Sequence, residues 1–297
     1  VSAARAAVVG DVMLDVVTRP LSPVAPTSDT PAATRVGRGG SGSNIAVALA
    51  RRGVDVTYVG AIGRDAAAAI VEGDLRREGV TPALEEVDGP TGVVVAVVAP
   101  DGQRAMITDR GVNPRLSSPH VARVLAEPFA HLHVSGYTVL EDATREVARA
   151  ALALARGRGM STSVDVCSVA PLRLVGPGAF LDATRDALTV FANEEEALTL
   201  AGRDDVDAAL AELAAAYPEV VVTRGARGAV ARRGTRAWRV GAEAAEVLDT
   251  TGAGDASTGA YLASILAGDD PDAALGAAMA AAAGVVAGLG SRGQSRL

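Results

Sequence analysis

The residues best suited to chemistry form the string Asp249-Thr250-Thr251-Gly252-Ala253-Gly254-Asp255, which precedes a helix-forming stretch. Its small residues allow a sharp turn whose backbone N–H groups point at one spot, and the positive end of the following helix adds to the attraction for an anion. Transfer of a phosphoryl group needs such a site, together with a carboxylate that accepts a hydroxyl proton. Asp255 is therefore the candidate base, and a Gly-rich turn with Asp255 as a helix N-cap is the structural alternative.

Composition sets the scale of the molecule around that string. The chain has 297 residues, of which 49% are hydrophobic and 3% aromatic, enough for one large α/β domain, with or without a small appendage, around a core of Ala, Val and Leu. Because no apolar run approaches the ~20 residues of a membrane-spanning helix and no basic segment opens the sequence, we expect neither a membrane span nor a signal peptide. Cys167 is the single cysteine, which fits a cytoplasmic location.

The charge pattern excludes two classes of protein. The formal net charge is −7, spread along the chain, and no basic stripe is present that would favour a nucleic acid. The sequence contains no lysine, so every basic side chain is an arginine. A Walker A phosphate-binding loop requires lysine and is therefore excluded.

Short β-like runs alternate with Ala-rich helical stretches over most of the length. The pattern predicts strands at Ala6–Val9 and Asp55–Val59 and helices at Asn44–Arg52 and Ala66–Glu78. Near the C-terminal end, Asp255–Gly288 predicts a pair of helices dense in small residues. Strands and helices that alternate at this spacing indicate a parallel sheet covered on both faces.

Two segments interrupt the alternation and predict a small inserted sheet. Val16–Val36 is rich in Pro, Ser and Thr and has little helical period. Val93–Ala99 and Arg104–Thr108 predict two strands joined by Pro100-Asp101-Gly102, and Asp-Gly between two β-rich runs is a strong hairpin signal.

The string that ends in Asp255 resembles the C-terminal signature of the PfkB/ribokinase family of kinases. In that family the last Asp is the catalytic base and the Gly-Ala-Gly backbone forms the anion hole, which implies these roles for Asp255 and for Gly252, Ala253 and Gly254. The segment Gly39-Gly40-Ser41-Gly42-Ser43-Asn44-Ile45-Ala46 is similar to the N-terminal GGxxxNxA signature. That likeness implies contacts to substrate hydroxyls from the residues Gly39, Gly40 and Asn44, with Asp255 beside them.

Three further strings match the family in the family's order, so that the resemblance spans the whole chain. Gly10-Asp11-Val12-Met13-Leu14-Asp15 places a substrate-binding carboxylate at Asp15, with Asp11 as the alternative for the same role. Asn193-Glu194-Glu195-Glu196 resembles the NxxE string that holds Mg²⁺ through water, which implies Glu196 for the metal. Thr223-Arg224-Gly225-Ala226-Arg227-Gly228 resembles the turn that touches the nucleotide. The residues implied for ATP are Asn193, Thr223, Gly225, Gly228, Gly252 and Gly254.

The asparagines support this transfer independently. The sequence has three, namely Asn44, Asn113 and Asn193, and two of them fall on motif positions that require an amide. An amide both donates to and accepts from a hydroxyl, which Ala or Arg cannot do.

The resemblance implies a three-layer α/β/α ribokinase-like (Rossmann-like) sandwich with a small β-sheet lid. Residues 1–11, 38–90 and 114–297 form the main domain, and residues 12–37 and 91–113 form the lid. The implied activity is ATP-dependent phosphorylation of a hydroxyl on a sugar or sugar-like molecule, with ATP and Mg²⁺ as cofactors. Asp249 and Thr251 match in part a K⁺ site of some relatives, and a homodimer through the lid is expected by the same analogy.

Three alternatives to a sugar kinase are open. Residues 37–42 satisfy GxGxxG, but they do not follow a buried strand, which places a dinucleotide site behind the kinase interpretation. A nucleoside kinase of the same family is disfavoured because few aromatics lie near the lid. A non-catalytic sugar or nucleotide sensor has no need of Asp255.

The sequence departs from the family at positions that bear on the substrate. Ser41 stands where ribokinases usually have Lys, and Cys167 and Ser257 replace commoner residues, so the substrate stays open. It includes sugar acids and sugar phosphates, because Arg38, Arg104 and Arg110 could bind an anion, with solvated surface arginines as the alternative. We also expect structural roles for His131 and His133, one facing the core and the other a helix.

Overall fold

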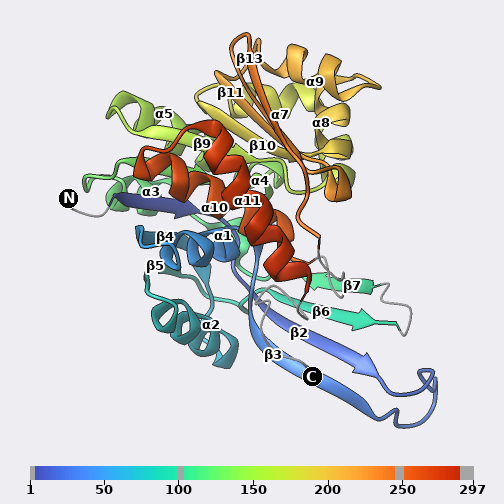
Figure 1. Cartoon of the computed structure of the whole chain (residues 1–297). Helices are drawn as coiled ribbons and strands as arrows, with labels where there is room; N and C mark the ends of the chain where they lie inside the picture. Colours follow the sequence, from blue (N-terminus) through green and yellow to red (C-terminus); the bar gives the residue numbers. More distant parts are fainter. Residues whose placement is uncertain (1–3, 100–103, 245–250, 288–297) are drawn as a thin grey trace.

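Two β-sheets organise the computed structural model, which describes residues 4–99, 104–244 and 251–287 (Figure 1). Within these residues the large sheet has nine strands. Their order is β13 (Arg236–Val240), β12 (Ala229–Arg233), β11 (Glu219–Thr223), β10 (Thr189–Asn193), β9 (Ser161–Asp165), β8 (His131–Val134), β1 (Arg5–Val9), β4 (Asp55–Ile62) and β5 (Val80–Glu86). The strands from β11 to β5 are parallel, while β12 and β13 continue the sheet in antiparallel pairs.

Helices cover both faces of this sheet, so the fold class expected from the sequence is confirmed. One face packs against α3 (Ser118–Val124), α4 (Gly136–Leu140), α5 (Arg145–Gly157), α6 (Val169–Val175), α7 (Pro177–Ala183), α8 (Glu194–Ala201) and α9 (Val206–Leu213). The other face packs against α1 (Ser41–Ala50), α2 (Ala66–Arg77), α10 (Ala253–Ala267) and α11 (Pro271–Val286). Short 3₁₀ turns follow β7 and β11, at Asn113–Arg115 and Gly225–Arg227.

The two faces explain why the central strands are continuous apolar runs rather than alternating ones. In β1, Ala7 and Val9 join the core on one side and Ala6 and Val8 the core on the other, each with no exposed surface. A parallel strand covered by helices on both sides has no solvent face to fill with polar residues.

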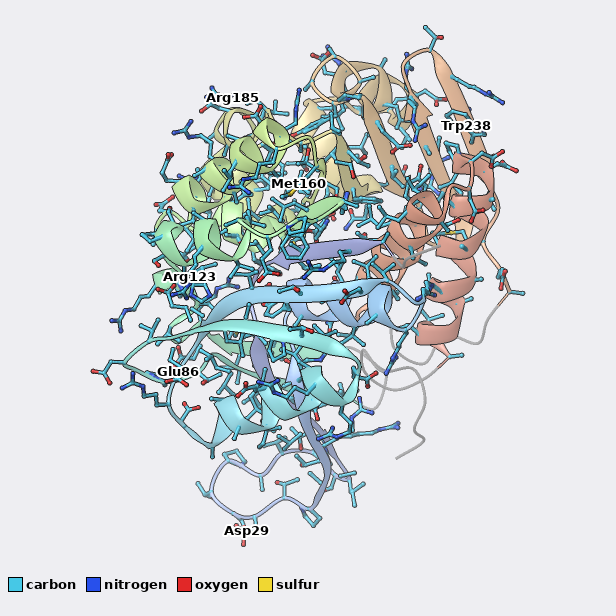
Figure 2. All side chains as sticks on the ribbon, turned by 90° about the vertical axis from the view of Figure 1, so that its left-hand side faces the viewer. Asp29, Glu86, Arg123, Met160, Arg185 and Trp238 are labelled. Carbon is cyan, nitrogen blue, oxygen red and sulfur yellow. The ribbon has the colours of Figure 1, made fainter. Side chains whose placement is uncertain are left out.

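A second sheet of four strands lies beside the large one, in the order β3 (Ala32–Gly39), β2 (Met13–Pro20), β6 (Val93–Val98) and β7 (Arg104–Asp109). The β6–β7 pair is antiparallel, as the hairpin signal predicts, and its turn lies outside the described residues. Figure 2 shows Asp29 at the tip of the loop between β2 and β3, far from Trp238 on the large sheet. Strand β3 runs to Gly39, two residues beyond the boundary expected for the lid.

The expectation that one of the two histidines of β8 faces the core and the other a helix is wrong. Side chains two residues apart on a strand point to the same face, and both His131 and His133 are buried beside one residue, Ser163 of β9. The Ser163 hydroxyl lies 2.8 Å from Nε2 of His131 and 2.8 Å from Nδ1 of His133. Burial lowers the pKa of His131 to about 3, which keeps that ring neutral in the interior.

Asn113 fixes the chain where it leaves β1. Its Oδ1 accepts a hydrogen bond from the Val12 N–H at 2.9 Å, and its Nδ2 donates to the carbonyl oxygens of Val12 and Arg110, each at 2.9 Å. Asn113, the asparagine outside the two family motifs, is therefore a structural clamp between the β1 exit and the segment after β7.

We expect Asn113→Ala to lower the free energy of unfolding by about 2–4 kcal/mol, because it leaves buried backbone groups of Val12 without partners. Denaturant unfolding measures the loss. The control is Glu212→Ala, which removes an exposed ion pair with Arg203 and should cost less than about 0.5 kcal/mol. Equal stability of the two variants would contradict the clamp.

Candidate active site

The polar residues of the cleft stand at the carboxyl ends of neighbouring parallel strands. Asp11 follows β1, Asp165 ends β9, Asn193 ends β10 and Thr223 ends β11. From β1 the chain proceeds to β4 and β5 on one side and later to β8 and β9 on the other, so the strand order reverses beside β1. In open α/β sheets ligands bind at the carboxyl edge beside such a reversal.

These strand ends open into a cleft of about 570 Å³, a size suited to a small-molecule site. The expected site residues that line it are Asp11, Asp15, Gly40, Asn44, Asn193, Glu196, Thr223, Thr251, Gly252, Gly254 and Asp255. Segments far apart in the sequence thus meet at one surface. Met13, Val94, Met106 and Thr108 of the second sheet also face the cleft, so both sheets contribute to it.

Asp255 lies in the first turn of α10, which begins after Gly252 in a left-handed conformation with φ 77°. Glycine adopts this conformation with little strain, and Gly252, Gly254 and Asp255 place the start of the helix, where the N–H groups lack helical partners, at the cleft wall. The Asp255 carboxylate accepts hydrogen bonds from Ser41 Oγ at Oδ1 and from Asn44 Nδ2 at Oδ2, both at 2.8 Å. Although part of the side chain faces the cleft, withdrawal from solvent raises the pKa of Asp255 to about 7.

Arg38 orients the Asn44 amide. Its guanidinium donates from Nη1 to Asn44 Oδ1 at 2.8 Å and to Ser43 Oγ at 2.7 Å. Because the amide oxygen is held by Arg38, the amide nitrogen faces Asp255. Arg38 is buried beneath α1 with 3% of its surface exposed, so it neither binds an anion in the cleft nor lies at the surface.

Helices α1 and α10 are in close contact one turn beyond this hydrogen bond. A Cβ atom placed on Gly259 would lie 2.4 Å from Cβ of Ala48, so the two helices approach as closely as a missing side chain allows. Ala48 follows Asn44 by four residues and Gly259 follows Asp255 by four, so each pair lies on one helix face. The glycine therefore sets the separation at which Asn44 and Asp255 meet.

The other carboxylates expected for the substrate lie across the cleft. Asp11 is buried, accepts from the Gly42 N–H at 3.3 Å, and has Nη1 of Arg110 4.0 Å from its Oδ2. Burial, the largest influence, raises the pKa of Asp11, and the positive charge of Arg110 opposes it. The Asp15 carboxylate fills the space where Gly39 lacks a side chain, since a Cβ there would lie 2.0 Å from its Oδ1 and 2.1 Å from its Oδ2.

Asn193 and Glu196 form the N-terminal cap of α8. Asn193 Oδ1 accepts from the Glu196 N–H, and Glu196 Oε2 accepts from the Asn193 N–H, each at 2.9 Å. Both also line the cleft, and burial raises the pKa of Glu196 to about 7. The motif residues thus have a structural role of their own, the capping box.

The remaining expected site residues lie at different distances from the chemistry, and several of them do not line the cleft. Gly225 and Gly228 lie in the turn after β11, outside the residues that line the cleft, and a Cβ on Gly228 would lie 1.9 Å from the Val240 carbonyl oxygen. Ala253 is the first residue of α10 and is half-buried. Ser257 is buried within α10, away from the cleft. Asp249 lies outside the described residues.

Sequence reasoning missed Asp165 as a site residue. It is buried, lines the cleft, and accepts hydrogen bonds from the Gly136 N–H at 2.9 Å and from Cys167 Sγ at 2.8 Å. The sequence feature that points to Asp165 is its place at the carboxyl end of a predicted strand, because polar residues converge there in parallel sheets. Cys167 has a φ of 68°, and it too faces the cleft.

The GxGxxG string does not form a dinucleotide loop. Its first three residues end β3, which pairs antiparallel with β2 in the small sheet, and its last two begin α1. A dinucleotide fingerprint instead links a buried parallel strand to its crossover helix.

Two observations bear on metals and membranes. Among the described residues, no group of three or more His, Cys, Asp or Glu side chains is placed to hold a metal ion. A divalent cation here would therefore depend on ligands such as phosphate oxygens and water, which fits the expectation that Glu196 holds it through water. No helix in the described part of the chain is long and apolar enough to cross a membrane.

Comparison with known proteins agrees with this geometry. The model of the pfkB family of carbohydrate kinases matches residues 3–295. The bifunctional protein HldE of Azorhizobium caulinodans is 32% identical over 96% of this chain, which spans 61% of that protein's length. Adenosine kinase from Sinorhizobium meliloti is 26% identical, with a TM-score of 0.86 over 98% of this chain and 96% of that one. A putative ribokinase II from E. coli in complex with ATP and Mg²⁺ shares the fold, at 23% identity and a TM-score of 0.87 over 99% and 96% of the two chains.

The chain belongs to the pfkB family of carbohydrate kinases, because the family model covers nearly its whole length. The likeness inferred from the sequence motifs is confirmed.

We expect Gly259→Ala to lower the free energy of unfolding by about 1–3 kcal/mol, because its methyl group overlaps Ala48. The double variant Ala48→Gly/Gly259→Ala moves the methyl group across the contact and keeps the summed helix propensity unchanged. It should recover at least half of the loss in denaturant unfolding. A double variant less stable than Gly259→Ala alone would show that this contact does not set the helix separation.

Proposed function

We propose that this chain transfers the γ-phosphoryl group of ATP to a hydroxyl of a sugar or sugar-like molecule. The observation that carries the proposal is the position of Asp255. Its carboxylate lies in the first turn of α10, faces the cleft, and is held by Ser41 and Asn44. A base and an anion-binding helix end thus meet at the place where a hydroxyl and a phosphoryl group would react.

In the proposed reaction Asp255 accepts the proton of the attacking hydroxyl. The N–H groups of residues 252–254 stabilise the charge of the phosphoryl group in flight. Asp15, Asp11, Gly39, Gly40 and Asn44 bind the other hydroxyls, and the three side chains among them that face the cleft accept or donate hydrogen bonds as sugars require.

The nucleotide is proposed to lie along the carboxyl ends of β10 and β11. Asn193 and Thr223 line that part of the cleft, and Gly252 and Gly254 border it. Contacts from Gly225 and Gly228 rest on the family resemblance. When bound, Mg²⁺ supplies positive charge to the β- and γ-phosphates, and Glu196 would hold it through water.

We propose that the second sheet acts as a lid and that it joins two copies of the chain. Among the described residues its strand β7 is an edge strand, and it exposes Ile107 (66%) on the face opposite to Met106, as a β surface for a second copy would. Sedimentation of a single monomeric species would reject the pairing. The cytoplasmic location expected from the single cysteine stays a prediction.

We favour a sugar-like acceptor over a nucleoside. Of the lining aromatics, Tyr137 has the Arg110 guanidinium 4.9 Å from its ring centre, and Phe191 packs edge-to-face against Tyr261. Each ring thus already contacts a protein group, which supports a sugar-like acceptor over a purine that would stack on it. A screen of ATP consumption across pentoses, hexoses, sugar acids, sugar phosphates and nucleosides decides the substrate class.

We expect Asp255→Asn to lower kcat by about 10²–10⁴ with the acceptor found in that screen, the usual range for a general base. Mg-ATP should still raise the melting temperature of the variant, because the nucleotide contacts remain. A near-normal rate would remove Asp255 from the role of base. No turnover by the parent on any acceptor would favour the sensor.

We also propose that K⁺ activates the enzyme through a site that includes Thr251, with Asp249 as its partner. Replacement of K⁺ by tetramethylammonium at equal ionic strength should then lower the initial rate, because the larger cation cannot enter a site of oxygen ligands. Equal rates in the two salts would reject the site.

A further inference from the structure

Asp165 has the surroundings of a carboxylate that stays ionised. Gly136 N–H donates to its Oδ1, and Cys167 Sγ donates to its Oδ2. His133 Nε2 lies 3.4 Å from Oδ1, which is longer than a well-formed hydrogen bond. Burial alone would raise the pKa of Asp165, but these groups outweigh burial and the pKa is lowered.

Ser41 lies between this carboxylate and the candidate base. Its Oγ is 2.8 Å from Asp255 Oδ1 and 3.2 Å from Asp165 Oδ2. A hydroxyl carries one proton, so it donates to only one of the two at a time. It accepts from a carboxyl group only when that group is protonated.

We propose that Asp165 is a second carboxylate of the catalytic centre, coupled to Asp255 by the Ser41 hydroxyl, which turns from Asp255 to Asp165 when Asp255 takes up the proton of the substrate. The inference rests on the proposed function. Asp165 and Ser41 are positioning residues in this scheme, because they act through Asp255.

The proton balance of the step is simple. The O–H bond of the acceptor breaks, its oxygen forms a bond to the γ-phosphorus, and the bond from that phosphorus to ADP breaks with its electron pair left on ADP. The proton forms a new O–H bond on Asp255. Protonated Asp255 then donates to Ser41 Oγ, and the Ser41 proton points to Asp165, until the proton leaves to water with the products.

The charges around Asp255 determine the direction in which each substitution should shift its pKa. Burial has the largest influence on the pKa of Asp255, and the hydrogen bond from Asn44 lowers it. Next come the charge of Asp165, which raises the pKa, and the hydrogen bond from Ser41, which lowers it. The charge of Asp11 also raises the pKa of Asp255. Glu196 is a further carboxyl group near Asp255, and Arg110 is the cation beside Asp11.

Replacement of Ser41 and replacement of Asp165 should therefore shift the pKa of Asp255 in opposite directions. Ser41→Ala removes a donor to ionised Asp255 and should raise its pKa by about one unit. Asp165→Asn removes a like charge, and its amide N–H₂ can donate to Ser41, which then donates permanently to Asp255. Both effects should lower the pKa, again by about one unit.

Carbon-13 NMR titration of the aspartate carboxyl groups in the full chain tests the coupling without any substrate. The Asp255 signal is assigned by its absence in Asp255→Asn. The controls are Ser264→Ala and Asp269→Asn, a serine–aspartate pair joined at 2.6 Å at the other end of α10, which should leave the Asp255 pKa unchanged. Thermal unfolding checks each variant, and Asp165→Ser, with the same expected direction, replaces Asp165→Asn if the latter does not fold.

The same shifts in the pKa of Asp255 should appear in the pH dependence of the reaction rate. Asp255 is a base only when ionised, so the single-turnover rate with ATP and the acceptor from the screen should rise with pH through about 7 in the parent. This rise should move to higher pH in Ser41→Ala and to lower pH in Asp165→Asn.

The outcomes separate the two proposals. Shifts of the same sign in both variants, no shift in either, or equal shifts in the controls would overturn the coupling, even in an active kinase. Opposite shifts in the NMR titration of a protein that phosphorylates no acceptor would overturn the proposed function and leave the coupling in place.

Discussion

The close contact between α1 and α10 is the constraint on which the site depends. Gly259 has no side chain, which allows Ala48 to approach, and one turn earlier the same helix faces bring Asn44 to Asp255. These helices belong to opposite ends of the sequence, and each begins beside the cleft. A larger residue at the contact would separate the two signature motifs, although it would touch neither of them.

Among the described residues that line the cleft beside this contact, carboxylates outnumber cationic side chains. The sequence has no lysine, and the described residues that line the cleft include several carboxylates and one arginine, Arg110. In the proposed reaction the phosphoryl group meets the backbone N–H groups at the start of α10. The buried Arg38 instead orients an amide, which shows how a charged residue can serve the site from beneath it.

Motif residues were predictable because they are required by local chemistry. A turn of small residues before a helix, an amide in an asparagine-poor chain, and strands alternating with helices all leave signals in the sequence. Residues such as Asp165, Ser41 and Arg38 leave weaker signals, because their roles arise from partners more than a hundred residues away or from burial beneath a helix. The error for His131 and His133 had a different origin, since strand geometry already places both on one face.

By itself the sequence determined the layered α/β class, the second small sheet, the family and the candidate base. These follow from periodicity and from strings of adjacent residues, whose geometry is set by the local backbone. Only the tertiary structure decided which carboxylate lies beside Asp255, how Asn44 is oriented, and that Gly225 and Gly228 stand outside the cleft. The reason is physical: hydrogen bonds and desolvation depend on distances of a few ångströms between chain segments whose packing no local pattern specifies.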